Sequence, residues 1–456
     1  MRIEALTLAA VPQTVASLRP PESSSRDIAE RVAAIVADVR TGGDTAVAAA
    51  TARFDWRGAT AATILVPAAD LDAAYADVEP ELLEALRTAR DNSAFFHRHE
   101  LRADWEDVGP QGQILGIRHL PVRRAGLYVP GGLGAYASTV IMNSVPALVA
   151  GVEELVICTP PGKDGRVNRS VLAAGRLMGV EKVFRVGGAQ AIAAMAHGTE
   201  TVPRVDVICG PGNAYVMEAK RQVYGSVGID SLAGPSEVLV VADSTARPAW
   251  IAADMLAQEE HGSGAEAMLV ADSPDLCRAV EQAVAELVTA RFAAASAQGV
   301  GAPASENDAA SAPAEQPAGE ALGARRFWAF YPAPGEDFLE LAAGLVNTYA
   351  PEHLEIQVTD SRGFLARVRS AGAVFLGHGT PTAFGDYIAG SNHVLPTGGS
   401  ARFSSPLSVD TFMRKSSFVE IPAGTARVLT PRLARVADSE GFFFHKLSAE
   451  LRTEGE

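Results

Sequence analysis

Residues 125–132 read Ala-Gly-Leu-Tyr-Val-Pro-Gly-Gly, a short apolar run that ends in two glycines. The same texture returns at 182–188 and at 205–213, and helix-like stretches lie between these runs. Apolar strands that alternate with helices are typical of a parallel sheet covered by helices on both faces. Because a similar alternation resumes over 267–376, the sequence predicts an α/β protein with two sheet-containing units.

The remaining segments set the predicted domain boundaries. Helical periodicity over 26–55 and a further helix over 78–100 precede the first apolar run. The prediction divides the chain into an N-terminal segment 1–25, a first α/β domain of 26–123 and 235–378, a second α/β domain 124–234, and a C-terminal loop and tail 379–456. Residues 293–323 contain almost no large apolar side chain, which predicts a mobile insertion within the first domain.

Composition excludes several classes of protein. A net charge of −15 argues against a nucleic acid or an anionic membrane as a partner. The chain has no apolar run of the ~18–20 residues that a membrane helix needs, and its N-terminus lacks the features of a signal peptide. A cytoplasmic location is therefore expected. The three cysteines are too few and too scattered for a disulfide framework or a Cys-rich zinc site.

Common cofactor and metal motifs are absent from the sequence. It contains no Gly-x-Gly-x-x-Gly after a strand, no P-loop, no His-Glu-x-x-His and no Cys-x-x-Cys. Any prediction of nucleotide or metal binding must therefore come from other residues.

A first candidate for metal binding is the stretch 258–262, Gln-Glu-Glu-His-Gly. Pro248 can begin a helix and Gly262 can end it, which places Gln258 and His261 three residues apart on one face. An amide oxygen and an imidazole nitrogen so placed could bind a zinc ion. On these residues alone, a solvated polar helix end with the histidine favoured by the helix dipole is the simpler interpretation.

A second candidate is the pair Glu352-His353, where a helix gives way to a strand. Histidine has the unperturbed pKa that suits a general base, and an adjacent carboxylate could activate water. The alternative is two exposed polar residues in a turn.

Two further segments carry polar groups in unusual surroundings. Asp386 and His393 lie in the glycine-rich segment 385–397, and such non-repetitive segments often carry function. Glu440 and His445 flank three phenylalanines, which predicts burial and therefore a partner for the histidine. His97 and His99 lie two residues apart in a predicted helix, a poor metal geometry, and are expected at the surface.

Taken in order along nearly the whole chain, these segments resemble the histidinol dehydrogenase family. The matching pieces include 126–132, 186–193, 210–213 and 233–237, followed by the four segments just described. The resemblance implies an NAD-dependent oxidation of L-histidinol through L-histidinal to L-histidine, at the end of histidine biosynthesis. It also implies two doubly wound, Rossmann-like parallel-sheet domains, with 124–234 on the nucleotide side. Small helical N- and C-terminal segments would pack on the partner subunit of a homodimer.

The resemblance also implies roles for individual residues. Glu352 and His353 would be catalytic, with His353 as the base and Glu352 activating water for the second oxidation. One zinc ion per subunit would be held by Gln258, His261 and Asp386, with His445 arriving from the partner. The substrate pocket would comprise Ser236, Gln258, His261, His353, Asp386, His393, Glu440 and His445. NAD would be bound by Tyr128, Gln190 and Asn213 on glycine-rich turns, although such turns could be purely structural.

Three other hypotheses fit parts of the pattern. A relative with the same scaffold could oxidise another diol or amino alcohol, but Glu440, His393 and the ligand set match the histidinol type. A zinc hydrolase using Glu352 would leave Tyr128, Gln190 and Asn213 without a purpose. A non-catalytic scaffold would require the whole polar set to be accidental.

Overall fold

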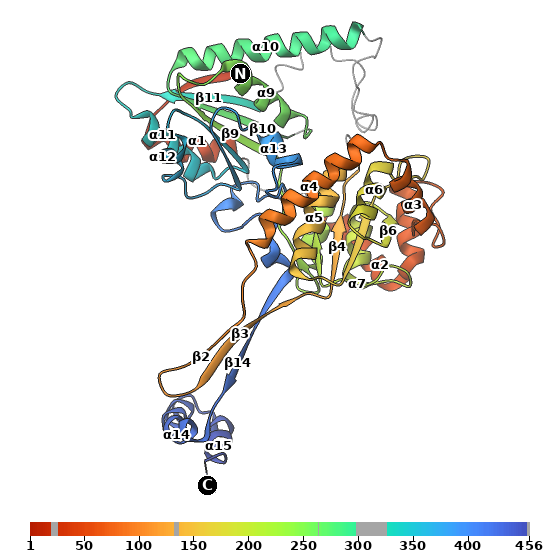
Figure 1. The fold of residues 1–456 in the computed structure, drawn as a ribbon, viewed down its shortest axis with the longest axis vertical. Helices are drawn as coiled ribbons and strands as arrows, with labels where there is room; N and C mark the ends of the chain where they lie inside the picture. The colour runs from red at the N-terminus through yellow and green to blue at the C-terminus, as the bar shows by residue number, and fades with distance from the viewer. Residues whose placement is uncertain (20–25, 132–135, 263, 298–325, 454–456) are drawn as a thin grey trace.

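A computed structural model of the chain describes residues 1–19, 26–131, 136–262, 264–297 and 326–453. Two parallel sheets with their covering helices form the main body, and an antiparallel sheet leads from it into a C-terminal arm (Figure 1). The predicted α/β fold with parallel sheets is confirmed.

The larger sheet has six parallel strands in the order β1-β11-β10-β9-β12-β13. Its strands are β1 (Arg2–Leu6), β9 (Glu237–Ala242), β10 (Glu266–Ala271), β11 (Arg326–Pro332), β12 (His353–Gln357) and β13 (Ala373–Leu376). Its helices are η1 (Leu8–Ala10), α1 (Val11–Leu18), α9 (Pro248–Glu259), α10 (Pro274–Ala297), α11 (Phe338–Tyr349), α12 (Ser361–Leu365) and α13 (Thr382–Tyr387). The strand order reverses between β9 and β12, and such a reversal is the usual place for a ligand site in an open α/β sheet.

Both faces of this sheet are buried because its central strands are apolar throughout. Val238 and Val240 of β9 face one cluster with residues of α9 and α10, whereas Leu239 and Val241 face another with residues of α1 and α11. This two-sided burial explains the continuous apolar run of β9, since strands that carry helices on both faces have no solvated side.

The smaller sheet has five parallel strands in the order β6-β5-β4-β7-β8. Its strands are β4 (Arg124–Tyr128), β5 (Glu154–Thr159), β6 (Lys182–Arg185), β7 (Val207–Cys209) and β8 (Gly228–Ile229). Its connecting helices are α5 (Ala137–Ala150), α6 (Arg169–Leu177), α7 (Gly188–His197) and α8 (Ala214–Val223). Again the order reverses, here between β4 and β7, and a buried apolar cluster covers each face.

The helices before the first parallel strand of this sheet also belong to it. They are α2 (Arg26–Phe54), α3 (Ala68–Asp77) and α4 (Pro80–Arg98), which contact α7 and α8, α6, and α5 respectively. The prediction had placed 26–123 with 235–378, and the structure corrects it: these helices pack on the other sheet. Helical periodicity identifies an apolar face but does not reveal which sheet that face contacts.

Helix α2 contains a break at a glycine. Gly43, within α2, has φ +53° and ψ −140°, outside the helical region. This backbone conformation favours glycine, whereas the Glu200 carboxylate that a Cβ would meet at 2.3 Å ends an exposed side chain that could move aside.

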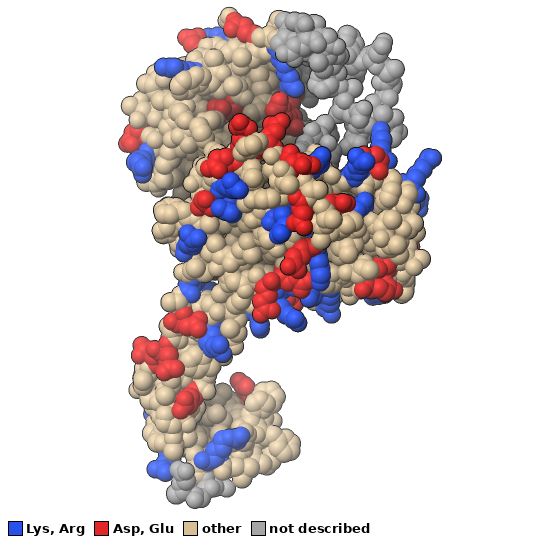
Figure 2. Space-filling view, turned by 45° about the vertical axis from the view of Figure 1, so that its right-hand side comes forward, with Lys and Arg blue, Asp and Glu red and all other residues tan. Residues whose placement is uncertain are grey.

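The antiparallel sheet connects the body to the arm. Strands β2 (Trp105–Val108), β3 (Ile114–Pro121) and β14 (Met413–Glu420) pair in the order β14-β3-β2. Beyond them lie α14 (Ala423–Ser439) and α15 (Phe443–Glu450), after the short helices η2 (Ser400–Arg402) and η3 (Val409–Phe412). Figure 2 shows this arm as a stalk that ends in a small lobe set apart from the body. The predicted tail is therefore joined by strands from 105–121, which the prediction had assigned to the first domain.

Two further predictions concern the insertion 293–323 and membrane-spanning helices. Of the predicted insertion 293–323, residues 293–297 continue helix α10, and the rest lies outside the described residues. Within the described ranges, none of the helices is both long enough and apolar enough to cross a bilayer.

Candidate active site

The predicted catalytic pair lies at the amino end of β12, beside the amino end of the adjacent strand β9. Glu352 immediately precedes β12, His353 is its first residue, and Ser236 immediately precedes the neighbouring strand β9. The three residues thus meet where the strand order of the six-stranded sheet reverses. The usual site at such a reversal is the carboxyl edge of the sheet, whereas this cluster lies at the amino edge.

Two hydrogen bonds fix one carboxylate oxygen of Glu352. Oε2 accepts a hydrogen bond from Ser236 Oγ at 2.5 Å and another from the backbone N–H of Glu237 at 2.9 Å. The side chain is buried, and the same oxygen lies 3.5 Å from Nδ1 of His353. The alternative of two exposed polar residues in a turn is therefore wrong.

Hydrogen bonding defines which nitrogen of His353 can act as a base. Nδ1 lies 3.1 Å from the carbonyl oxygen of Glu237, and because a carbonyl can only accept, Nδ1 carries the hydrogen. Nε2 therefore has the free lone pair of the neutral ring, and it lies 3.5 Å from Asp386 Oδ1. Burial disfavours the charged ring, but Glu352 and Asp386 outweigh it and raise the pKa of His353 to about 9.

Asp386, in α13, lies among three imidazoles. Burial opposes its ionisation, but His353, His393 and His261 together lower the pKa of Asp386. His393 follows in the loop after α13, where its Nδ1 donates to the Asp386 carbonyl oxygen at 2.8 Å. Its Nε2 lies 3.4 Å from Thr139 Oγ1 in α5, so His393 connects the two sheet units. Burial lowers the pKa of His393.

Gln258 and His261 lie at and just beyond the end of α9. The helix begins with Pro248 as predicted, but it ends at Glu259, so His261 lies in the following turn rather than on the helix face. Gln258 is buried and its Nε2 has no hydrogen-bond partner among the described residues, whereas His261 is exposed. Helices α9 and α13 are in contact, and His261 is close enough to influence the Asp386 carboxylate.

A zinc ion fits this donor set, although the single chain does not complete it. No three His, Cys, Asp or Glu side chains within the described part of the chain lie close enough together to hold a metal ion. The proposed site would contribute only His261 and Asp386 to such a group, because Gln258 is an amide and the fourth ligand would come from outside this chain. The unpaired buried amide of Gln258 is consistent with a ligand that is supplied on binding.

The predicted nucleotide residues lie at the carboxyl edge of the five-stranded sheet. Tyr128 ends β4, and its hydroxyl accepts a hydrogen bond from the N–H of Gly188 at 3.1 Å. Gln190 is buried in the first turn of α7, and Asn213 is exposed at the start of α8, where its side chain caps the helix by accepting from Tyr215 N. Two of the three residues therefore also support the turns that carry them.

Two further groups of residues shape these turns without having been predicted as site residues. Asp55 accepts hydrogen bonds from Gly187 N at 3.0 Å and from Gln190 Nε2 at 3.1 Å, and burial raises the pKa of Asp55. Lys220 and Asp230 form a buried ion pair that binds both polar backbone atoms of Gly210. Asp55, Lys220 and Asp230 were not predicted, since an isolated lysine or aspartate far along the chain does not indicate its partner.

Glu440 and His445 do not reach the site within this chain. They lie in the arm, at the end of α14 and within α15, and both are exposed. The predicted burial beside the three phenylalanines is wrong for the single chain, because Phe442, Phe443 and Phe444 are 50%, 64% and 77% exposed. His445 contacts only its neighbour Phe442 among the aromatic rings of the described residues, with ring centroids 5.0 Å apart.

His97 was expected at the surface and is instead fully buried. Its Nδ1 lies 2.8 Å from Glu100 Oε2, and its Nε2 lies 3.3 Å from the amide nitrogen of Asn392, next to His393. A spacing of two residues does place His97 and His99 on different faces of α4, but it does not show that one of those faces packs on another element.

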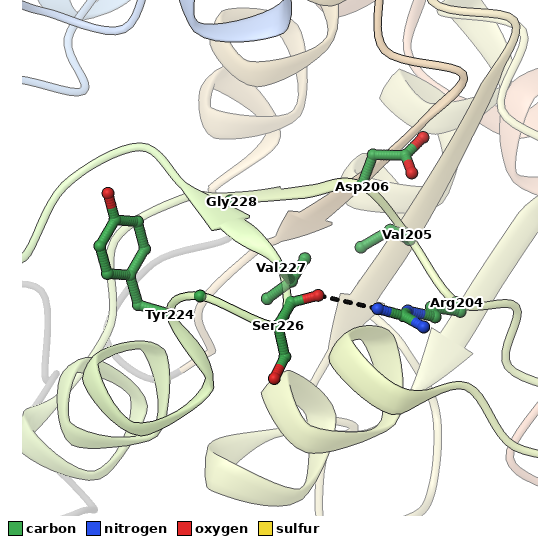
Figure 3. Close-up of a pocket in the computed structure, with 8 residues that line it drawn as sticks. Arg204, Val205, Asp206, Tyr224, Ser226, Val227 and Gly228 are labelled. Carbon is green, nitrogen blue, oxygen red and sulfur yellow. Dashed lines mark hydrogen bonds between the residues drawn. The ribbon is translucent and has the colours of Figure 1, made fainter. Parts of the chain in front are cut away.

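A cavity of about 450 Å³ lies away from all of these residues. Its lining includes Arg204, Tyr224 and Ser226, and Arg204 donates a hydrogen bond to the Ser226 carbonyl oxygen at 2.9 Å (Figure 3). The lining comes from the amino ends of β7 and β8, the opposite edge of the sheet from Tyr128 and Asn213. It contains none of the predicted site residues.

Comparison with known proteins assigns the chain to a family. The family model described as histidinol dehydrogenase matches residues 18–314 and 336–453. The chain is 46% identical over 422 residues to the histidinol dehydrogenase of Thermosynechococcus vestitus, covering 92% of each chain. It is 44% identical over 452 residues to that of Rhodospirillum rubrum, covering 99% of this chain and 98% of the relative. The crystal structure of histidinol dehydrogenase from Elizabethkingia anophelis matches with a TM-score of 0.86 and 30% identity, over 99% of this chain and 98% of that one. This chain therefore belongs to the histidinol dehydrogenase family of oxidoreductases.

Proposed function

We propose that this chain oxidises L-histidinol to L-histidine in two NAD-dependent steps, through L-histidinal, as a cytoplasmic enzyme of histidine biosynthesis. The observation that carries the proposal is the arrangement of His353 and Glu352 within a chain of this family. His353 presents an unprotonated Nε2 in its neutral form, and Glu352 holds a fixed carboxylate beside it. A base and a water-activating group are the two protein functions that consecutive alcohol and aldehyde oxidations require.

The first step needs a base at the hydroxyl group. Nε2 of His353 takes the hydroxyl proton while the carbon–hydrogen bond gives its electron pair to NAD as hydride, which leaves an aldehyde. The carbonyl of Glu237 holds the Nδ1 hydrogen, so the ring keeps one tautomer and one orientation throughout.

The second step needs water. Glu352 accepts a proton from water as the water oxygen adds to the aldehyde carbon, while the aldehyde oxygen takes back the proton held by His353. The hydrate then gives a hydroxyl proton to Nε2 of His353 and a second hydride to NAD, and the acid so formed releases a proton to give the carboxylate. The bonds from Ser236 and Glu237 keep the Glu352 carboxylate oriented for this task. Two NAD are consumed for each histidinol.

The proposed metal ligands are Gln258, His261 and Asp386 of one subunit and His445 of the other. These give two nitrogen and two oxygen ligands, a mixture that zinc accepts. When bound, zinc supplies positive charge that orients a substrate imidazole and amine and stabilises developing negative charge. Ser236 and His393 border the same space, and Glu440 would arrive together with His445.

The proposed nucleotide site is the carboxyl edge of the five-stranded sheet, at Tyr128, Gln190 and Asn213. Here three turns meet, beside the point where the strand order reverses. Gly210 has φ +115°, and a Cβ there would lie 2.0 Å from the Tyr128 carbonyl oxygen, so the turns pack backbone against backbone. This edge is where doubly wound, Rossmann-like domains bind nucleotides, and we propose that both sheet units are of this type.

We further propose a homodimer in which each arm completes the partner's site. Large apolar side chains of the arm are exposed, with Val436 at 58%, Phe443 at 64% and Phe444 at 77%. An isolated lobe that exposes so much apolar surface is typical of a protein–protein interface. In the site of a partner subunit, Glu440 and His445 could join the remaining predicted residues.

Counting NADH tests the proposal. The purified chain should form two NADH for each L-histidinol, lose this activity on treatment with a chelator and regain it when zinc is restored. One NADH per substrate would contradict the second oxidation. Turnover of another diol in place of histidinol would contradict the proposed substrate.

A further inference from the structure

Strand β12 buries a polar face as well as an apolar one. Its residues alternate, with Leu354 and Ile356 on one side and His353, Glu355 and Gln357 on the other, and all five are buried. Leu354 and Ile356 join the cluster that contains α11. The polar side chains share their face with Val238 and Val240, their neighbours on β9, which pack against α9. Burying polar side chains costs free energy of folding unless they are hydrogen-bonded. The hydrogen-bond partners of this face therefore indicate its role.

Glu355 connects three elements through hydrogen bonds. Its Oε1 accepts from the backbone N–H of Thr382, the first residue of α13, at 2.9 Å. Its Oε2 accepts from Gln357 Nε2 at 2.8 Å, and the same nitrogen donates to Asp254 Oδ2 in α9 at 3.1 Å. A single buried network therefore joins β12 to α9 and to α13.

Gln357 Nε2 holds the two carboxyl groups of this network close together. Burial and the nearby Asp254 raise the pKa of Glu355 well above its usual range, and burial also raises the pKa of Asp254. Burial and the closeness of the two groups therefore favour a neutral carboxyl group on Glu355. A neutral Glu355 can donate to Asp254 while its other oxygen continues to accept from Thr382.

The network lies one helical turn from two of the proposed metal ligands. Asp254 precedes Gln258 by four residues in α9, and Thr382 precedes Asp386 by four residues in α13. Four residues rise about 6 Å along a helix axis, and side chains so spaced lie on the same face. Glu355 is two residues beyond His353, on the same face of β12.

We propose that Asp254 and Glu355 are positioning residues that hold α9 and α13 against β12, so that Gln258 and Asp386 can meet at one metal ion. This inference rests on the proposed zinc site. Groups that orient metal ligands without touching the metal commonly change metal affinity about 10–100-fold when they are removed.

The test measures zinc affinity directly, in the full-length purified protein, by competition with a chromophoric chelator. Glu355→Leu removes the network and should weaken zinc binding by about 10–100-fold. Glu355→Gln should weaken zinc binding less than Glu355→Leu does, because its amide oxygen still accepts from Thr382, although its amide nitrogen cannot accept from Gln357. If Glu355→Leu does not fold, Asp254→Ala, at a half-buried position, should show the same weakening.

Leu341→Ala is the matched control. Leu341 is fully buried in α11 on the opposite face of the sheet, so its loss lowers stability without touching the network. Its zinc affinity should equal that of the wild type. Wild-type zinc affinity in both Glu355→Leu and Asp254→Ala would overturn the inference, and so would equal losses in Glu355→Gln and Glu355→Leu. A wild-type chain that binds no zinc would instead contradict the proposed function.

Discussion

At the residue scale, one backbone carbonyl orients the imidazole of His353, and two nearby carboxylates favour its protonated form. Because its pKa is raised to about 9, the ring is mostly protonated at neutral pH and becomes a base as pH rises. The first oxidation should therefore speed up as pH rises, and because zinc would neutralise the Asp386 carboxylate, the rising limb should lie at or below about pH 9. Glu352→Gln removes the carboxylate 3.5 Å from Nδ1, which should lower the pKa of His353 and move the rising limb to lower pH. The pH dependence of kcat/KM for histidinol measures this shift. The exposed substitution Glu340→Gln is the control, and an unmoved limb in Glu352→Gln would contradict the electrostatic account.

Glu352→Gln also separates the two half-reactions. The amide cannot accept a proton from water, so the oxidation of histidinal should fall by about 10²–10⁴-fold, the usual contribution of a positioned base. The oxidation of histidinol to histidinal should be largely spared. Single-turnover measurements that start from each substrate separately would show this difference. Equal losses in both reactions would mean that Glu352 does not act on water alone.

The sequence allowed the identities of these two residues to be predicted, but not their surroundings. A histidine beside a glutamate at a helix-to-strand junction is visible in the chain. That Ser236 and Glu237, more than a hundred residues earlier, bind Glu352 depends on β9 lying next to β12. His97 shows the same limit, because its burial depends on Glu100 and Asn392 together.

At the element scale, the turn after β7 depends on a buried ion pair. Lys220 of α8 binds Asp230 and donates to the Gly210 carbonyl oxygen at 2.7 Å, while Asp230 accepts from Gly210 N at 2.7 Å. Both side chains are less than 5% exposed. Lys220→Met leaves a buried carboxylate unpaired, which should cost about 3–5 kcal/mol of stability. It should also raise the KM for NAD more than the KM for histidinol.

Thermal unfolding and steady-state kinetics measure these two effects. The neighbouring Arg221→Met is the control, because Arg221 is half exposed and Gln222 still donates to the Glu218 carboxylate when Arg221 is removed, so this variant should lose less stability than Lys220→Met. A double variant, Lys220→Met with Asp230→Asn, should recover part of the lost stability, since no charge is left buried. Equal effects of Lys220→Met and Arg221→Met would show that the ion pair does not support the turn.

Elements were easier to predict than their assembly. Apolar runs that end in glycine identified most of the parallel strands, because a strand that is buried on both faces consists almost entirely of apolar residues. The polar face of β12 was not predicted, since alternation such as His-Leu-Glu-Ile-Gln normally indicates a half-exposed strand. The packing of α2, α3 and α4 was assigned to the wrong sheet, because neither helix periodicity nor sequence order specifies the surface that an amphipathic helix covers.

At the scale of the whole molecule, the site residues of one chain do not come together. His353 and Asp386 lie in the body, whereas Glu440 and His445 lie in the arm, at the far end of the antiparallel sheet (Figure 1). The sequence suggested a detached tail from composition alone, and only the structure shows that β2 and β3 extend with it. Removing the chain beyond about residue 430 should therefore abolish activity in a protein whose two sheets still fold.

Mixing two inactive variants tests shared sites more directly than truncation. His353→Ala lacks the base, and His445→Ala lacks the ligand from the arm, so each homodimer should be inactive. When the two are unfolded together and refolded, a mixed dimer contains one site built from the intact body of the His445→Ala chain and the intact arm of the His353→Ala chain. Random pairing makes half of the dimers mixed, with one working site each, so activity should return to about a quarter of wild type. If each site were formed within one chain, mixing would restore none. Refolding each variant alone is the control, and the average zinc bound per dimer should stay unchanged on mixing, because the His353→Ala chain keeps all the proposed zinc ligands.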